Sequence, residues 1–433
     1  SQGKTTGVFQ LESAGMRGVV MSMKPQSIED ITAAVALFRP GPMASIPTYI
    51  NCKHHPEQVT YKHPLLKDIL SVTYGCTVYQ EQVMEIFRRL AGYSLAQADL
   101  VRKAMGKKKM DVLKSERENF IHGNEEQGIA GCVKNGVPEQ VASELFDDLL
   151  EFANYAFNKA HAVCYAILAY QTAYVKYHYP KEYMAALMTS VLDDSGKVSE
   201  YILECREMGI AVLTPDVNES GADFTVSGDN IRFGLAAVKN VGRAFVQALV
   251  RQREQGGRFR SFNDFCQRMA ETDMNKRVLE SLIRCGAFDS FGHKRSQLLR
   301  VYEQVLDSSA NERRKNIEGQ IDLFAAVEEE QPREIPLPDI PEFPRNELLN
   351  MEKQTTGIYL SGHPLEAQKE LIQTIGARPI GQILAAFGQE EGDVVQPTDL
   401  QDGMFVTVAG VVSAFKLKTT KNNTAMAYVT LED

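Results

Sequence analysis

Residues 161–179 read HAVCYAILAYQTAYVKYHY, and this stretch decides the fold class. Its apolar residues recur every three or four positions, which is the spacing of one face of an α-helix. The same spacing returns in SIEDITAAVALF (27–38), YQEQVMEIFRRLAGY (79–93) and EQVASELFDDLLEFANYAF (139–157). We therefore predict a mainly α-helical fold for residues 1–190.

Local signals set several helix ends. Ser27 predicts an N-cap, because Glu29 and Asp30 follow it in the first helical turn. The proline pair Pro40 and Pro42 predicts the end of that helix, and Pro180 predicts the end of the long helix from His161.

Composition places the chain among globular proteins. It has 433 residues, of which 44% are hydrophobic and 24% charged, so each of about three domains can bury a core. No run of about 18 apolar residues occurs, so no membrane-spanning helix is expected. Seven cysteines without a C-x-x-C pair indicate reduced thiols of a cytoplasmic protein. The net charge of −9 argues only weakly against nucleic acid, since clustering of cations matters more.

The pattern changes after residue 190. Residues 191–233 predict a connector, in which AVLTPDVN (211–218) and DFTVSGDNIRFG (223–234) are read as short strands with a Gly228-Asp229 turn. Residues 311–345 end in an acidic run followed by five prolines, which predicts an extended linker. Residues 346–403 return to helical spacing, and residues 404–433 alternate with period two around a polar turn, as in a hairpin. Both chain ends resemble cuts within a longer protein.

The strongest charge cluster is LVRKAMGKKKM, residues 100–110. Its five cations predict a phosphate contact, although a solvated helix face would look similar; they are Arg102, Lys103, Lys107, Lys108 and Lys109.

A second candidate is the start of the long helix, FNKAHAVCYA, residues 157–166. Asn158 is a good N-cap, and a helix N-terminus favours anions. Lys159 is therefore out of place for helix stability alone and, with His161, suggests a phosphate ligand. Four tyrosines follow at helical spacing; they could stack on bases, but this spacing favours the core.

A third candidate is GLAAVKNVGRAFVQALV, residues 234–250, with a weaker copy around Cys285-Gly286-Ala287. Two short helices joined by a turn at Gly242 resemble a helix–hairpin–helix, which grips a DNA phosphate through backbone N–H groups. Lys239 and Arg243 flank the turn, and Asn240 stands where glycine is usual, which its tolerance of a left-handed φ permits.

A fourth candidate is QIDLF, residues 320–324. Gln320 followed by Leu323 and Phe324 is typical of a docking peptide whose two apolar side chains fill a pocket. Asp322 directly precedes these two residues. A local core anchor is the alternative.

Other motifs are missing. The sequence has no Walker A loop, no G-x-G-x-x-G, no H-E-x-x-H and no metal-spaced Cys/His cluster. No two aspartates stand two residues apart, so we assign neither a catalytic residue nor a metal ligand, and no two-metal centre.

Several long motifs resemble one family. They are GVFQLESAGMR (7–17), ALFRPGPM (36–43), YGCTVYQEQVM (74–84), RKAMGKKK (102–109), FNKAHAVCYAILAYQTAYVKYHYPKEYMAALM (157–188), QIDLF (320–324) and GIYLSGHPL (357–365). In this order they are similar to the bacterial DNA polymerase III alpha subunits, the C family of replicative DNA polymerases. The likeness extends along essentially the whole chain.

The resemblance implies a domain order. It gives a multi-helical fingers domain (1–190), the connector (191–233), a tandem helix–hairpin–helix region (234–310), a sliding-clamp motif with its linker (311–345), a helical connector (346–403) and a truncated OB domain (404–433). An OB fold has five strands. The family's palm, which carries its aspartates, would precede residue 1.

The resemblance also implies an activity, DNA-directed DNA polymerisation, with two Mg²⁺ ions bound by the palm. The expected partners are primer–template DNA, deoxynucleoside triphosphate, the sliding clamp (beta subunit) and other holoenzyme subunits, in the cytoplasm and without a membrane. The six cations above and His161 would neutralise phosphates, joined by Arg39 of RPGP and Gln80 of YQEQ. Ala160 replaces a common serine, so any hydroxyl contact there is lost.

One prediction follows for this chain alone. It should have no polymerase activity, because the aspartate pair is absent from it. The residues leave two alternative classes of protein open. One is a non-catalytic DNA-binding clamp adaptor, and the other is a helical scaffold.

Overall fold

The computed structural model describes residues 2–107, 110–152, 155–317, 335–387, 399–419 and 425–433. The described chain divides into two compact units. Unit 1 contains residues 1–174 and 381–404, and unit 2 contains residues 175–380 and 405–433.

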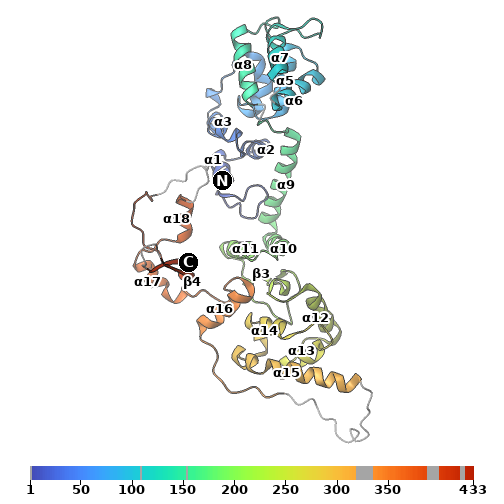
Figure 1. The fold of residues 1–433 in the computed structure, drawn as a ribbon, viewed down its shortest axis with the longest axis vertical. Helices are drawn as coiled ribbons and strands as arrows, with labels where there is room; N and C mark the ends of the chain where they lie inside the picture. The colour runs from blue at the N-terminus through green and yellow to red at the C-terminus, as the bar shows by residue number, and fades with distance from the viewer. Residues whose placement is uncertain (1, 108–109, 153–154, 318–334, 388–398, 420–424) are drawn as a thin grey trace. The chain divides into compact units, whose positions relative to one another are not determined.

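Helices dominate both units, which confirms the mainly α prediction (Figure 1). The α-helices up to residue 178 are α1 Ala14–Met23, α2 Ile28–Leu37, α3 Ile46–His54, α4 Lys67–Leu70, α5 Gln80–Ala91, α6 Leu95–Gly106, α7 Met110–His122, α8 Glu139–Phe152 and α9 Lys159–His178. Short 3-10 turns join them at η1 Pro42–Ser45, η2 Pro56–Gln58, η3 Pro64–Leu66 and η4 Ser71–Thr73.

The remaining α-helices are α10 Pro180–Ser190, α11 Ser195–Glu207, α12 Arg243–Gly256, α13 Phe262–Met269, α14 Lys276–Arg284, α15 Arg295–Ile317, α16 Arg345–Thr356, α17 Lys369–Thr374 and α18 Ile380–Phe387. Further 3-10 turns are η5 Leu235–Ala237, η6 Asp289–Phe291 and η7 Glu366–Gln368.

The predicted helix ends are confirmed. Ser27 caps α2 in a reciprocal capping box with Asp30, and α2 ends at Leu37, before the proline pair. The long helix α9 ends at His178, and Pro180 then occupies the first position of α10, where its missing N–H costs nothing.

Two small sheets account for the described strands. The strands β1 Val212–Leu213, β2 Thr225–Ser227 and β3 Asn230–Arg232 form one sheet in the order β1-β3-β2, in which β2 and β3 are antiparallel across the predicted Gly228 turn. The strands β4 Val411–Thr419 and β5 Ala425–Glu432 form an antiparallel pair, as the alternating pattern predicts.

Unit 1 has two cores. One surrounds Phe87 and Phe120 and joins α5, α6, α7 and α8. The other surrounds Met23 and Tyr49 and includes Ala162 and Ala169 of α9. The buried face of α9 therefore consists of alanines. The tyrosines Tyr170, Tyr174 and Tyr177 are 54%, 48% and 80% exposed, so their predicted place in the core is wrong.

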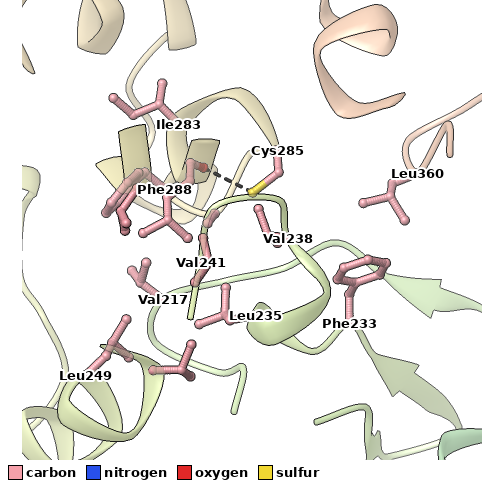
Figure 2. Close-up of a cluster of buried hydrophobic side chains, with 14 of the residues drawn as sticks. Val217, Phe233, Leu235, Val238, Val241, Leu249, Ile283, Cys285, Phe288 and Leu360 are labelled. Carbon is pink, nitrogen blue, oxygen red and sulfur yellow. Dashed lines mark hydrogen bonds between the residues drawn. The ribbon is translucent and has the colours of Figure 1, made fainter. Parts of the chain in front are cut away.

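Unit 2 has one continuous core that spans α10 to α15. Figure 2 shows its centre, where Val238 and Val241 lie among Leu235, Leu249 and Phe288. These valines flank the turn that leads into α12, so burial of their side chains fixes the turn and leaves its polar residues outside.

The seven cysteines all lie in described residues, and each is a free thiol, as predicted. Burial raises the pKa of Cys205 and of Cys285 to about 12. Such thiols stay protonated and act as small apolar side chains.

Candidate functional site

The segment from Tyr155 to His161 brings several predicted residues together in unit 1. The backbone N–H of Gln80 donates to the carbonyl of Phe157 over 2.9 Å, and its side-chain amide donates to the carbonyl of Ala156 over 2.9 Å. Arg102 donates to the Gln80 Oε1 atom over 3.1 Å. The structure therefore joins Gln80 and Arg102 to this segment by direct contacts.

The start of α9 is occupied by side chains of the same unit. Asn158 caps it, since its Oδ1 accepts from the His161 N–H over 2.8 Å, as predicted. Glu81 accepts from the Lys159 N–H over 2.9 Å. The Lys159 ammonium lies 3.1 Å from a carboxylate oxygen of Glu29. The unusual Lys159 thus has carboxylate partners within the chain, and an external phosphate would have to compete with them.

The α6 cations are partly neutralised as well. Asp99 pairs with Arg102 over 2.8 Å and with Lys103 over 2.6 Å. Hydrogen bonds from Lys103 and then Arg102 hold the pKa of Asp99 below its ordinary value. Lys107 follows the last helical residue and is exposed. Lys108 and Lys109 lie outside the described residues.

Arg39 differs from these cations. Its guanidinium stacks on the Phe157 ring, 3.9 Å from the centroid, and donates to the carbonyl of Tyr155 over 3.2 Å. Its Nε is buried and has no hydrogen-bond partner, and no carboxylate of the described residues pairs with it. Burial lowers the pKa of Arg39, yet an arginine stays protonated. The stacked cation therefore has donor capacity to spare.

Arg39 lines a pocket of about 570 Å³ in unit 1. His161 lies on the same wall, with its ring 5.4 Å from Phe157 and 4.5 Å from Tyr165. Ser13 and Gln10 also line it, and Gln10 has a φ of +62°, an uncommon conformation for a non-glycine residue. The pocket size suits a small ligand, and Glu12 on its wall is an acid that such a ligand would meet.

Sequence reasoning missed the acids and the ring that organise this region. Asp99 stands three and four residues before Arg102 and Lys103, a helical spacing that predicts their pairing. Phe157 and the distant acids Glu29 and Glu81 give no such local signal, because only the tertiary fold brings them to the same place.

In unit 2, the turn before α12 has the predicted geometry (we call residues 235–256 the first hairpin). Asn240 has a φ of +67°, so it does adopt the left-handed conformation. Its amide donates to the hydroxyl of Ser281 over 3.0 Å, and the Lys239 N–H donates to the carbonyl of Thr355 over 2.8 Å. One expectation needs correction: the element before the turn is the single 3-10 turn η5, and not a helix.

The start of α12 is open. Gly242 is its N-cap residue, and no side chain caps the helix. Lys239, Asn240, Gly242 and Arg243 are all exposed. Arg243 pairs with Asp223 over 2.8 Å, whereas no carboxylate of the described residues pairs with Lys239. A groove of about 740 Å³, lined by this turn and by the end of α16, adjoins the open helix start.

The remaining candidates lie elsewhere. Gln320, Asp322, Leu323 and Phe324 are outside the described residues. Within the described residues, no three metal-ligating side chains gather into a cluster. No described helix is both long enough and apolar enough to cross a membrane.

Two family models match the chain. Residues 1–128 match the finger domain of the bacterial DNA polymerase III alpha subunit, and residues 209–298 match a helix–hairpin–helix motif. The resemblance to the bacterial DNA polymerase III alpha subunit is confirmed. The two matches contain the Arg39–Gln80–Arg102 region and the first hairpin, respectively.

Curated relatives agree with the models. The DNA polymerase III subunit alpha of Thermus aquaticus is 45% identical over the whole chain, and that of Saccharopolyspora erythraea is 43% identical over the whole chain. The chain covers 34% and 36% of these two relatives, and so spans about a third of their length. A third relative with the same name, from Deinococcus radiodurans, is 41% identical over the whole chain, which covers 32% of it.

Proposed function

We propose that this chain is part of a replicative DNA-directed DNA polymerase and helps to hold the incoming deoxynucleoside triphosphate and the primer–template DNA. The observation that carries the nucleotide part is Arg39. It presents a stacked guanidinium without a carboxylate partner in a pocket that also contains His161. Charge-assisted hydrogen bonds from such a group suit phosphate oxygens.

The residues divide into two roles in this proposal. Arg39 and His161 contact the triphosphate directly. Gln80, Arg102 and Lys159 hold the surrounding segment, and the two cations among them supply positive potential. The other cations of residues 102–109 neutralise nearby phosphates; these are Lys103, Lys107, Lys108 and Lys109. Nucleotidyl transfer builds charge on the phosphoryl oxygens, so positioned cations lower its barrier.

The catalytic Mg²⁺ ions belong, in this proposal, to the palm of the longer polypeptide. When bound there, they would activate the primer 3′-OH and stabilise the leaving pyrophosphate. The described residues offer no cluster of ligands that fits them. We therefore assign no reaction step of the metal to this chain.

The first hairpin is the proposed DNA contact. Its open helix start and the exposed Lys239 can bind a backbone phosphate without reading bases. Asn240 and Gly242 give the turn its shape, and Arg243 adds charge beside it. The helix–hairpin–helix match to residues 209–298 supports this role.

Triphosphate binding tests the nucleotide site. We expect Arg39→Ala to weaken binding of dATP, measured by calorimetry, about tenfold, because one hydrogen bond to a charged group contributes about 1.5–3 kcal/mol. The matched control is Arg88→Ala, since Arg88 is an exposed arginine of α5 paired with Glu85; it should bind dATP as the unaltered chain does. Equal affinity of all three proteins would remove Arg39 from the site.

Clamp docking is proposed for Gln320, Asp322, Leu323 and Phe324 on the strength of the sequence pattern. The double variant Leu323→Ala with Phe324→Ala should lose binding to a sliding clamp, since single anchor residues contribute about 2 kcal/mol or more. Unchanged affinity in calorimetry would contradict the docking role. We also propose that the chain binds other holoenzyme subunits and is located in the cytoplasm.

The chain alone should not extend a primer, because we place the catalytic aspartates outside it. A primer-extension assay with Mg²⁺ and all four nucleotides checks this, and any extended product refutes it. The alternative, a DNA-binding clamp adaptor, explains the hairpin equally well. It gives no reason for the finger-domain match over residues 1–128.

A further inference from the structure

The proline-rich segment 335–344 lies across the start of α15 in unit 2. The carbonyl of Pro338 accepts from the Gln297 side-chain amide over 2.8 Å, and the carbonyl of Pro341 accepts from the Ser296 hydroxyl over 2.9 Å. The Lys294 ammonium donates to the carbonyl of Ile340 over 2.9 Å. The segment has no helix or strand, as predicted for a linker, but these bonds fix it to the helix.

Glu342 is the central contact of this segment. One carboxylate oxygen accepts from the Arg295 N–H over 2.7 Å, and the other accepts from the Ser296 N–H over 3.0 Å. Burial raises the pKa of Glu342, but hydrogen bonds from Phe343, Ser296 and Arg295 outweigh it and hold the pKa below its ordinary value. The carboxylate is thus an anion seated on a helix N-terminus.

The set of donors around Glu342 is one that suits a phosphate. It comprises two backbone N–H groups at a helix start, a serine hydroxyl and a lysine ammonium. The Arg295 side chain does not add to it, because Asp289 and Glu352 already pair with its guanidinium over 2.6 and 3.1 Å. All four donors are engaged by the segment 335–344.

The helix α15 holds the same place in its hairpin as α12 does in the first. The first hairpin leads through its turn into α12, and the second hairpin, α14 to α15, leads through η6 into α15. The start of α12 has no side-chain cap, whereas the start of α15 is closed by Glu342. The helix start of the first hairpin can therefore accept an anion, whereas that of the second hairpin already holds the Glu342 carboxylate.

We propose that Glu342 occupies a second binding site for a DNA backbone phosphate at the start of α15. Unit 2 then contacts DNA through the first hairpin alone until the segment 335–344 leaves α15. This inference rests on the proposed DNA binding by the first hairpin. The ligand class is a phosphodiester, and the second contact uses the Arg295 and Ser296 N–H groups, the Ser296 hydroxyl and Lys294.

The test is binding of fluorescein-labelled duplex DNA to the full chain, measured by anisotropy over a range of salt concentrations. Glu342→Gln removes the charge and should tighten binding about three- to tenfold, the size of a charge effect at a helix terminus. One more phosphate contact should also steepen the dependence of log K on log salt by about 1. Adding Lys294→Ala to this variant should remove the gain.

The matched control is Glu347→Gln, which removes an exposed glutamate from the first turn of α16. It changes the net charge equally and should leave the affinity and salt slope as they are. An equal gain in this control, or an unchanged slope and affinity in Glu342→Gln, overturns the inference. If Glu342→Gln melts below the assay temperature, Glu342→Asp decides, because the shorter carboxylate cannot bridge both N–H groups and should give a smaller gain.

A further variant separates the two proposals. Lys239→Ala should weaken DNA binding if the first hairpin contacts DNA. When Lys239→Ala has no effect and Glu342→Gln still gains affinity, the first-hairpin proposal fails. The phosphate site at the start of α15 then stands, but the statement that the first hairpin alone contacts DNA before that site opens does not. When Lys239→Ala weakens binding and Glu342→Gln changes nothing, the reverse holds.

Discussion

Helices α9 and α12 begin in opposite ways, although sequence suggests an anion site at both. At α9, Asn158 and Glu81 accept the first N–H groups, and Glu29 holds Lys159. At α12, glycine is the N-cap residue and no side chain takes the donors. The first arrangement stabilises the fold by its own charges, so a ligand must exchange with them. The second leaves donors ready for a ligand.

The largest effect is expected from the buried carboxylate of α16, the helix that contacts both hairpins. Glu352 of α16 is fully buried, pairs with Arg295 and accepts from the Leu360 and Ser361 N–H groups. Glu352→Ala leaves Arg295 buried with one partner fewer and should cost about 3–5 kcal/mol.

Hydrogen exchange with peptide resolution measures this cost in each unit. Protection should fall in unit 2, whose core includes Leu360, and not around Phe87 in unit 1. Glu347→Ala, an exposed change in the same helix, is the control. Equal loss of protection in both units would contradict a stabilising role of Glu352 within unit 2.

The next effect concerns the turn itself. Asn240→Ala places an alanine at a φ of +67° and removes the hydrogen bond to Ser281. It should cost about 1–2 kcal/mol in urea denaturation. Asn240→Gly keeps the conformation and should cost less. An equal cost for glycine and alanine would mean that the side-chain bond, which both variants lose, matters more than the left-handed backbone.

Glu81→Gln makes the start of α9 more like that of α12. It removes the charge that accepts from the Lys159 N–H, so stability should fall by about 1 kcal/mol, the usual value of a helix cap. The freed donors and Lys159 should bind dATP more tightly in calorimetry. Glu85→Gln, a change in the same helix at a residue paired with Arg88 and Arg89, should not alter dATP binding. Weaker dATP binding by Glu81→Gln would show that Glu81 positions the site.

The smallest effect is expected from the two ion pairs that Asp99 makes on α6. Asp99→Asn should change stability by less than about 1 kcal/mol, because surface ion pairs contribute little. The pKa of Asp99 is lowered in the folded chain, so its contribution is present above the unfolded pKa and is lost as pH falls through the folded one. The unaltered chain and the variant should therefore converge in stability below about pH 4. A difference that persists in thermal melts at lower pH would exclude Asp99 as its source.

Sequence was sufficient for features that depend on neighbours along the chain. The Ser27 capping box, the Asn158 cap and the left-handed Asn240 each follow from one residue and its nearest positions. The prediction that Tyr170 and Tyr174 lie in the core is wrong, because helical spacing shows that a helix has two faces but does not show which of them is buried. The residues of α9 that pack into the core of unit 1 are alanines, and not tyrosines.

Sequence was insufficient where residues distant along the chain meet. Glu29 and Glu81 reach Lys159, and Glu342 reaches α15, across separations that no local pattern encodes. The stacking of Arg39 on Phe157 joins residues more than a hundred positions apart. Charge patterns therefore located the cations but could not show which of them already had partners.

Helix α16 connects the two hairpins mechanically. Its Thr355 carbonyl holds the Lys239 N–H of the first turn, and its Glu352 carboxylate holds Arg295 of the second. A force on either turn is transmitted to α16, so a bound duplex that strains one hairpin would also load the other. Helix α16 therefore resists a change in the spacing of the two hairpins.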